Sequence, residues 1–348
     1  MVSYIVVARL EPLLLSRQRY DYRMGEKYLI REVESARRMN VGVGLVLLSA
    51  FTFGLMPVLT KLAYAENLNL NTLLTIRFCL AAVVLWVIWL LRHEPPASTG
   101  QVTLPSLLPV VLMGAVAYVG QSFSYFTALS LISASFTGLL LYAYPPAVTL
   151  LAWILLRERI TRRKIAALLC ALLGIVLVLQ LASSLLGGTG QDFSNLNAAG
   201  VAWGLAAAFI YSVYIVSGAI FARRFDPIFS SAVVITSAAT VYVIWGAFSG
   251  TLRFDVTPTG WIIASVIALV CTVVAIVAFF AGLPLVGPSR AAILSTAEPA
   301  ITVITATIVL QEQITLEQVA GGILIVASVF VLQSGSAEVK KNEAPNKV

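Results

Sequence analysis

The chain has 348 residues, of which 59% are hydrophobic and only 11% are charged, whereas about 25% of a typical soluble domain is charged. This composition excludes a soluble enzyme and indicates a membrane protein. The net charge of +7 would suit a nucleic-acid-binding protein, but its distribution follows membrane topology, so we expect no nucleic-acid partner.

The first 40 residues are expected to form a cytoplasmic extension. Arg9, Glu11 and Pro12 interrupt the early apolar stretch, which therefore resembles neither a transmembrane span nor a signal peptide. Residues 26–39 can form a charged amphipathic helix on the membrane surface. The alternative is that the native protein starts at Met39, directly before the first span, and lacks residues 1–38.

Ten apolar segments follow, each near the roughly 20 residues that a helix needs to cross a bilayer. They comprise 41–63, 71–91, 105–128, 133–155 and 164–182, then 198–221, 228–248, 261–282, 288–309 and 317–333. A linker at 183–197 separates the two groups and a tail covers 334–348. The connections are too short to hold a soluble domain, so we predict an all-α polytopic membrane protein.

The two halves repeat each other. The motif Leu-Arg-Glu-Arg-Ile-Thr at 156–161 returns as Leu-Gln-Glu-Gln-Ile-Thr at 310–315, an offset of 154 residues. Basic residues follow the first copy, whereas Leu316, Glu317 and Gln318 follow the second. Related sequences with different charge at the same corner indicate two inverted five-helix repeats, 41–182 and 198–333, the usual build of a secondary transporter.

The positive-inside rule orients this arrangement. If both termini are cytoplasmic, 20 of the 23 Lys and Arg residues fall in cytoplasmic segments. The predicted outer loops then contain a single basic residue, Arg253, among mostly acidic ones. We therefore predict that both termini lie in the cytoplasm.

These features resemble the EamA-type members of the drug/metabolite transporter superfamily. The pair Arg77-Phe78, the two Leu-x-Glu-x-Ile-Thr corners and the segment 287–299 carry the resemblance. The first half has Tyr144-Pro145-Pro146 where the second has Ala297-Glu298-Pro299, so only one half carries the acidic version. The resemblance implies a transporter or exporter of small metabolites. It also implies a central cavity lined by the first, third, fourth, sixth, eighth and ninth spans.

Glu298 is the foremost candidate for function. It lies near the middle of the ninth span, where a charged side chain costs about 2.5–3.5 kcal/mol, so it must be protonated, paired or exposed to a cavity. Ser295 and Thr302 share its helical face, and Pro299 weakens the helix beside it. We expect Glu298 to contact substrate or exchange a proton; the alternative is an interhelical hydrogen bond that fixes packing.

Aromatic and amide stripes complete the predicted binding cavity. Helical spacing of three and four residues places them on one face of the third and sixth spans, with Tyr142 as a further candidate in the fourth. Polar groups near mid-bilayer need partners and should face inward; lipid-facing aromatics are the alternative. The stripes comprise Tyr118, Gln121, Tyr125, Trp203, Tyr211 and Tyr214.

Two arginines and three prolines are candidates for coupling and gating. Arg77 lies about 9 Å below the predicted outer boundary, at 1.5 Å per residue. It is either a snorkelling or structural residue, or an anion contact or outer-gate pair. Arg290, at the cytoplasmic start of the ninth span, either forms an inner gate or only sets orientation. Pro57 and Pro145, with Pro299, are candidate bending points.

The sequence predicts no enzyme, cofactor or metal site. The three cysteines have no ligand spacing, and no histidine lies in a span. We expect a secondary-active carrier in a bacterial cytoplasmic (inner) membrane, exporting amino acids or related amphipathic compounds by alternating access. Its partners would be a small-molecule substrate and the lipid bilayer, with proton coupling as a hypothesis. A multidrug or cation efflux carrier, a channel and a non-transporting receptor are alternatives, and the protein is a monomer or homodimer.

Overall fold

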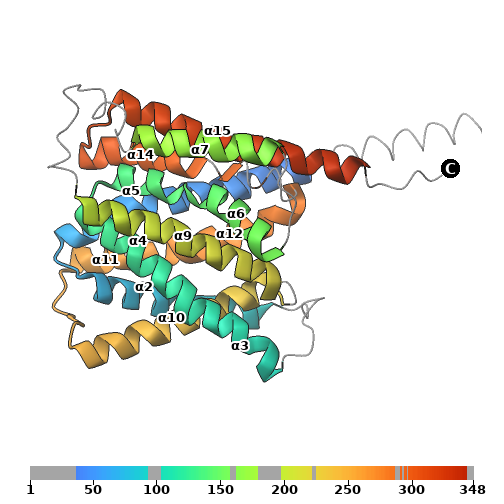
Figure 1. Cartoon of the computed structure of the whole chain (residues 1–348). Coiled ribbons are helices and arrows are strands. Elements are labelled where there is room, and N and C mark those ends of the chain that lie inside the picture. The colour runs from blue at the N-terminus through green and yellow to red at the C-terminus, as the bar shows by residue number, and fades with distance from the viewer. Residues whose placement is uncertain are drawn as a thin grey trace, which may run out of the picture.

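The computed structural model describes residues 37–92, 103–156, 162–178, 197–221, 225–286, 291, 294–295 and 297–342. Every regular element within these ranges is a helix. The long helices run side by side as one elongated bundle (Figure 1). Residues 183–196 of the predicted linker 183–197 and most of the N-terminal extension lie outside the described residues, as does Arg290.

Six described helices are long and apolar enough to cross a membrane, so the chain is an integral multi-pass membrane protein. All six coincide with predicted spans. They are Arg37–Ala65; α2, Leu70–Leu91; Leu104–Leu131, formed by α3 (Leu104–Leu112), the π-helical η1 (Met113–Tyr118) and α4 (Val119–Leu131); α9, Ala198–Phe221; α10, Pro227–Ser249; and Pro258–Val286, formed by α11 (Pro258–Ala268), the π-helical η4 (Leu269–Val274) and α12 (Ala275–Val286).

The remaining four predicted spans fall on helices outside this set of six. The span 133–155 is two helices, α5 (Ala134–Leu141) and α6 (Tyr144–Leu156), interrupted at Tyr142 and Ala143. The others are α7 (Arg162–Val178), α14 (Ala297–Leu310) and α15 (Leu316–Asn342). Ten crossings in two inverted halves therefore stay a prediction.

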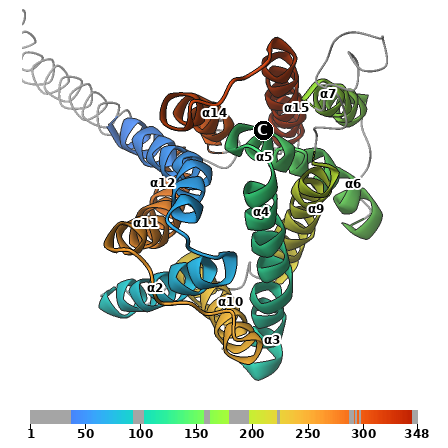
Figure 2. The same ribbon diagram turned by 90° about the vertical axis from the view of Figure 1, so that its left-hand side faces the viewer.

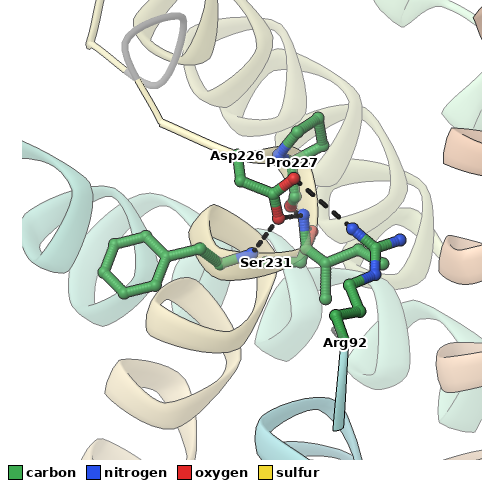
Figure 3. Close-up of polar contacts among 6 residues, drawn as sticks. Arg92, Asp226, Pro227 and Ser231 are labelled. Carbon is green, nitrogen blue, oxygen red and sulfur yellow. Dashed lines mark hydrogen bonds and ion pairs between the residues drawn. The ribbon is translucent and has the colours of Figure 1, made fainter. Parts of the chain in front are cut away.

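Helix caps mark the two ends of the bundle. At one end, called here the Asn69 end, the Asn69 side chain accepts from the Thr72 N–H at 2.8 Å and begins α2. At the opposite Asp226 end, the Asp226 carboxylate accepts from the N–H groups of Ile228 and Phe229, both at 3.0 Å. The same carboxylate lies 3.5 Å from the Arg92 guanidinium and so joins the end of α2 to the start of α10 (Figure 3).

Packing in the bundle groups the helices into pairs. Viewed along the bundle, α2 and α10 lie together on one side and α7 and α15 on the opposite side (Figure 2). The Arg37–Ala65 helix packs on α12, where a Cβ added to Gly282 would lie 2.8 Å from the Val46 side chain. On the other side of the bundle α4 packs against α9. Between these pairs lie the two short helices, α5 and α14, which carry the candidate site.

Candidate functional site

Helix α14 is wedged between the Arg37–Ala65 helix and α5. The Thr302 hydroxyl donates to the carbonyl oxygen of Gly54 at 2.9 Å, and a Cβ added to Gly138 of α5 would lie 3.1 Å from Thr302. A Cβ added to Gly54 would lie 2.9 Å from the carbonyl oxygen of Glu298. Gly54 and Gly138 therefore let the Arg37–Ala65 helix and α5 pack closely against the start of α14, which carries Glu298.

Glu298 lies half-buried in the first turn of α14 and faces Tyr142. The Tyr142 hydroxyl lies 3.1 Å from Glu298 Oε2 and 3.2 Å from the carbonyl oxygen of Ser295. Tyr142 occupies the interruption between α5 and α6, so a break in one helix supplies the hydrogen-bond donor to the carboxylate of another. Glu298 Oε1 has no hydrogen-bond partner among the described residues. This oxygen is available to a proton or to a ligand.

A continuous row of tyrosines leads away from Glu298. Successive ring centroids are separated by 5.8 Å between Tyr142 and Tyr144, and by 4.9 Å between Tyr144 and Tyr211. The row continues to Tyr214 at 6.0 Å and from there to Tyr118 at 5.3 Å. The row connects α6, α9 and η1, and it unites the stripes predicted on the third and sixth spans.

Four phenol groups lie within electrostatic range of the Glu298 carboxylate. They are Tyr125, Tyr142, Tyr144 and Tyr211. Phenols can donate hydrogen bonds to a carboxylate, and their ring faces attract organic cations within about 6 Å of the ring centre. The arrangement can therefore hold either a proton or an ammonium group beside Glu298.

Arg77 supplies the opposite charge inside the bundle. Its side chain is only 3% exposed, and its Nε donates to the Thr272 hydroxyl in η4 at 2.9 Å. Its guanidinium carbon lies 4.8 Å from the ring centre of Phe78 and 5.2 Å from that of Phe126. The two terminal nitrogens have no acceptor among the described residues. Arg77 is therefore held inside the protein and does not snorkel.

Tyr125 interacts electrostatically with both charges. Its hydroxyl is within electrostatic range of both Glu298 and Arg77, and its ring contacts Phe126, over which the Arg77 guanidinium also sits. An acidic and a basic group thus approach one phenol from different helices. Such a pair of buried opposite charges suits a ligand that carries both charges.

The other predicted site residues occupy less central positions. The Ser295 hydroxyl donates to the carbonyl oxygen of Ala291 at 3.0 Å, and Gln121 accepts from the Ser122 hydroxyl at 3.3 Å. Trp203 is 37% exposed and contacts Phe123, not the tyrosines around Glu298. Thr302 makes the packing contact with Gly54 described above.

The three prolines predicted as bending points occupy different positions in their helices. The Arg37–Ala65 helix continues through Pro57, which is buried. Pro145 is the second residue of α6, directly after the interruption at Tyr142 and Ala143. Pro299 is buried in the first turn of α14, where proline is tolerated because the N–H group it lacks would have no acceptor within the helix.

Glu312 is a structural residue whose role the sequence did not reveal. Its two carboxylate oxygens accept from the N–H groups of Ala134 at 2.7 Å and Ser135 at 3.0 Å, at the start of α5. A carboxylate is favoured at a helix N-terminus, where N–H groups lack partners. Lys61 lies within electrostatic range of it. The repeated Leu-x-Glu-x-Ile-Thr corner indicated that this glutamate matters, but it did not indicate that its partners are the N–H groups at the start of α5.

The bundle of membrane-spanning helices defines a polytopic membrane protein. The EamA-like transporter family matches residues 40–180 and 198–333. The chain therefore belongs to this family, which is part of the drug/metabolite transporter superfamily.

Known relatives agree with this membership. The chain is 24% identical to "Uncharacterized transporter YcbK" of Bacillus subtilis (strain 168), over 83% of this chain and 92% of that protein. It is 27% identical to "Uncharacterized transporter sll1319" of Synechocystis sp., over 84% and 93%. A crystal structure of another protein covers 84% of this chain and 98% of its own, with a TM-score of 0.56 and 20% identity. This last likeness shows a shared fold alone.

Proposed function

We propose that this EamA-family transporter is a secondary-active exporter of small ammonium-bearing metabolites, with amino acids and related amphipathic compounds as the first class. One observation carries the proposal: the half-buried carboxylate of Glu298 accepts a hydrogen bond from Tyr142 and lies within electrostatic range of Tyr125, Tyr144 and Tyr211, and Tyr125 is also within electrostatic range of Arg77, whose terminal nitrogens have no acceptor among the described residues. The bacterial relatives favour the cytoplasmic membrane of a bacterium.

A zwitterion satisfies both charges at once. Its ammonium group would replace a proton on Glu298 and lie against the ring faces of Tyr144 and Tyr211, a cation–π contact. Its carboxylate would accept from the terminal nitrogens of Arg77 in a charge-assisted, two-pronged contact. Phosphate esters fit less well, because binding them calls for several basic groups and Arg77 is the sole Lys or Arg buried among the described residues.

Alternating access between two inverted halves would carry the substrate across. Two features support this part of the proposal. The π-helical segments η1 and η4 lie in the third and eighth predicted spans, and each follows a threonine cap, Thr103 or Thr257, 154 residues apart. The first predicted span packs on the eighth, and the sixth packs on the third. In each case the first span of one half packs on the third span of the other half, as expected for two halves related by a pseudo-two-fold axis. Both termini would lie in the cytoplasm.

Glu298 would couple substrate movement to protons. A proton and an ammonium group compete for the same carboxylate, so binding of one releases the other. A transporter needs two states separated by only a few kcal/mol, and this exchange would bias them. The hydrogen bond from Tyr142 joins Glu298 of α14 to the interruption between α5 and α6. Protonation of Glu298 or binding of an ammonium group would therefore act directly on the position of α5 and α6.

Counterflow in proteoliposomes tests the proposal. Vesicles loaded with unlabelled leucine should accumulate labelled leucine, and Arg77→Gln should abolish this accumulation while Arg77→Lys retains part of it. Arg92→Gln, at the Asp226 end, is the matched control and should behave as wild type. A channel would show flux without counterflow, and a non-transporting receptor would show no flux; either result would remove the carrier proposal.

A cation efflux carrier is the second candidate, favoured by the tyrosines around a single carboxylate. A lipophilic cation needs Glu298 and the aromatic rings but not Arg77. Tetraphenylphosphonium counterflow that survives in Arg77→Gln, with no leucine counterflow in wild type, would establish this candidate in place of the first.

A further inference from the structure

A cavity lies at the Asn69 end, apart from the Glu298 site. Its volume is about 570 Å³, within the range of about 300–1,000 Å³ that is usual for small-molecule sites. It opens among the ends of α2, α4 and α10, and neither Glu298 nor Arg77 lines it. Its walls are Asn69, Leu70, Asn71, Phe123, Tyr242, Trp245, Gly250, Thr251 and Arg253.

One wall of this cavity is a turn that is bonded to α2. The side-chain amides of Asn69 and Asn71 donate to the carbonyl oxygen and the hydroxyl of Thr251, both at 2.7 Å. Gly250 ends α10 in the left-handed conformation, with φ of 61°, which reverses the chain toward α2. The backbone N–H of Arg253 then donates to the Thr72 hydroxyl at 3.0 Å. These contacts fix the main chain of Arg253 beside the cavity.

The Arg253 side chain remains available to a ligand. It is exposed, and its guanidinium makes no ion pair or hydrogen bond with the described residues, the nearby acidic Asp255 included. It is also the one basic residue that the sequence places in the predicted outer loops. Lys61, which lines a neighbouring cavity of about 400 Å³, already lies within electrostatic range of Glu312.

Three of the lining residues are aromatic. The rings of Phe123 and Trp245 lie 6.0 Å apart, and Trp245 is 55% exposed. Tyr242 is held in place by its hydroxyl, which donates to the carbonyl oxygen of Val119 at 3.0 Å. Its ring stacks on Phe78 at 5.5 Å, next to Arg77. A cavity lined by one guanidinium and by aromatic rings matches a molecule with an anionic head and an apolar body.

We infer that this cavity is an accessory site for small organic anions with an apolar body, bound through a carboxylate on Arg253 and through apolar contact with Phe123 and Trp245. The planar guanidinium of arginine binds carboxylates in a two-pronged geometry. The site rests on the proposed function only in one respect: it would hold the carboxylate end of a substrate on its way between Arg77 and the outside, past Tyr242.

A probe without an ammonium group isolates this site. N-acetyl-leucine carries a carboxylate and an apolar body but offers nothing to Glu298, and Trp245 reports its arrival through tryptophan fluorescence. The titration uses the full-length Glu298→Gln protein in detergent, so that the central carboxylate plays no part. We expect a saturable change that Trp245→Phe removes and that Arg253→Gln weakens at least about tenfold, the effect of losing one charged hydrogen bond. Arg92→Gln is the matched control and should bind as its parent does.

Four results would overturn the inference. The first is equal binding of N-acetyl-leucine to Arg253→Gln. The second is loss of binding in Arg77→Gln alone, which would move the anion contact to Arg77. The third is equal binding of the uncharged N-acetyl-leucinamide. The fourth is a response to anionic phospholipid without any response to the soluble probe. Because the titration lacks Glu298 and the leucine counterflow assay depends on it, failure of this site and failure of the proposed function are separate results.

Discussion

Two helix pairs in this bundle share a close glycine contact, at Gly138 of α5 and at Gly174 of α7, but the first pair is also joined by side-chain hydrogen bonds. The α5–α14 pair is joined by hydrogen bonds at both ends. Glu312, just after α14, accepts from the N–H groups of Ala134 and Ser135 at the start of α5, and the Tyr142 hydroxyl, just after α5, donates to Glu298 at the start of α14. The α7–α15 pair packs through Gly174, where an added Cβ would lie 2.7 Å from both the Gly321 carbonyl oxygen and the Ile325 side chain.

This difference in contacts indicates that the two helix pairs have different roles in transport. Polar contacts can be exchanged for contacts with water, a proton or a substrate at little net cost, because a hydrogen bond adds only about 0.5–1.5 kcal/mol net. Close contacts between small residues have no such replacement, and small residues at helix interfaces are how membrane helices associate tightly. We therefore interpret α7–α15 as a fixed brace and α5–α14 as the pair that rearranges.

Glu298→Gln should give the largest effect. The amide keeps the size of the side chain but binds neither a proton nor an ammonium group. Hydrogen bonds to charged groups contribute about 1.5–3 kcal/mol, so substrate binding should weaken about 10- to 100-fold and counterflow should be lost. Thermal stability in detergent should change little. Glu66→Gln, at the Asn69 end, is the control. Transport that survives with unchanged pH dependence would make Glu298 a packing residue.

Gly174→Ala tests the brace. The new Cβ would meet backbone atoms that cannot move aside, and overpacking costs about 1–3 kcal/mol. Gly44→Ala is the matched control, because nothing lies within 4 Å of the added atom and alanine is about 1 kcal/mol better than glycine in a helix. Thermal unfolding should move in opposite directions for the two variants. Equal shifts would show that α7 and α15 do not pack closely.

Glu312→Gln should have a smaller effect, at the other end of α5. An amide oxygen can accept one of the two N–H groups, while its own NH₂ opposes the other, so we expect a loss of about 1 kcal/mol, the usual value of a helix cap. Transport should slow because α5 loses its attachment to the end of α14. Differential scanning fluorimetry and counterflow measure the two effects. A variant as stable and active as Glu66→Gln would rule out the attachment.

Thr302→Val should give the smallest change. Valine keeps the shape but loses the hydrogen bond to the Gly54 carbonyl oxygen, which costs about 0.5–1.5 kcal/mol. Leucine counterflow should remain. Loss of transport without loss of stability would instead return Thr302 to the substrate-binding face on which the sequence placed it.

The sequence predicted the helices better than the contacts between them. Apolar length located six spans, because a bilayer imposes that length on any crossing helix. Pro145 was a candidate bending point in the fourth span, and the interruption at Tyr142 and Ala143 lies just before it. The contact between Tyr142 and Glu298 joins residues 156 positions apart, and it depends on how two helices are rotated, which periodicity does not define.

The predicted environments of single residues were less certain for the same reason. Spacing grouped Trp203 with Tyr211 and Tyr214, but Trp203 contacts Phe123 instead. Snorkelling was one expectation for Arg77, yet the Thr272 hydroxyl of η4 provides an internal partner that only the folded bundle brings near. Glu312 was visible as part of a repeated motif, but its role as a cap requires the position of α5.

Ligand-dependent thermal stability of the purified protein tests whether Glu298 forms the substrate-binding site. Wild type and Glu298→Gln would be compared against leucine, tetraphenylphosphonium and glucose 6-phosphate. We expect a compound bearing a positive charge to stabilise wild type, and we expect the variant to lose this response. Equal stabilisation of both proteins, or stabilisation by the sugar phosphate alone, would contradict a binding site built on the Glu298 carboxylate.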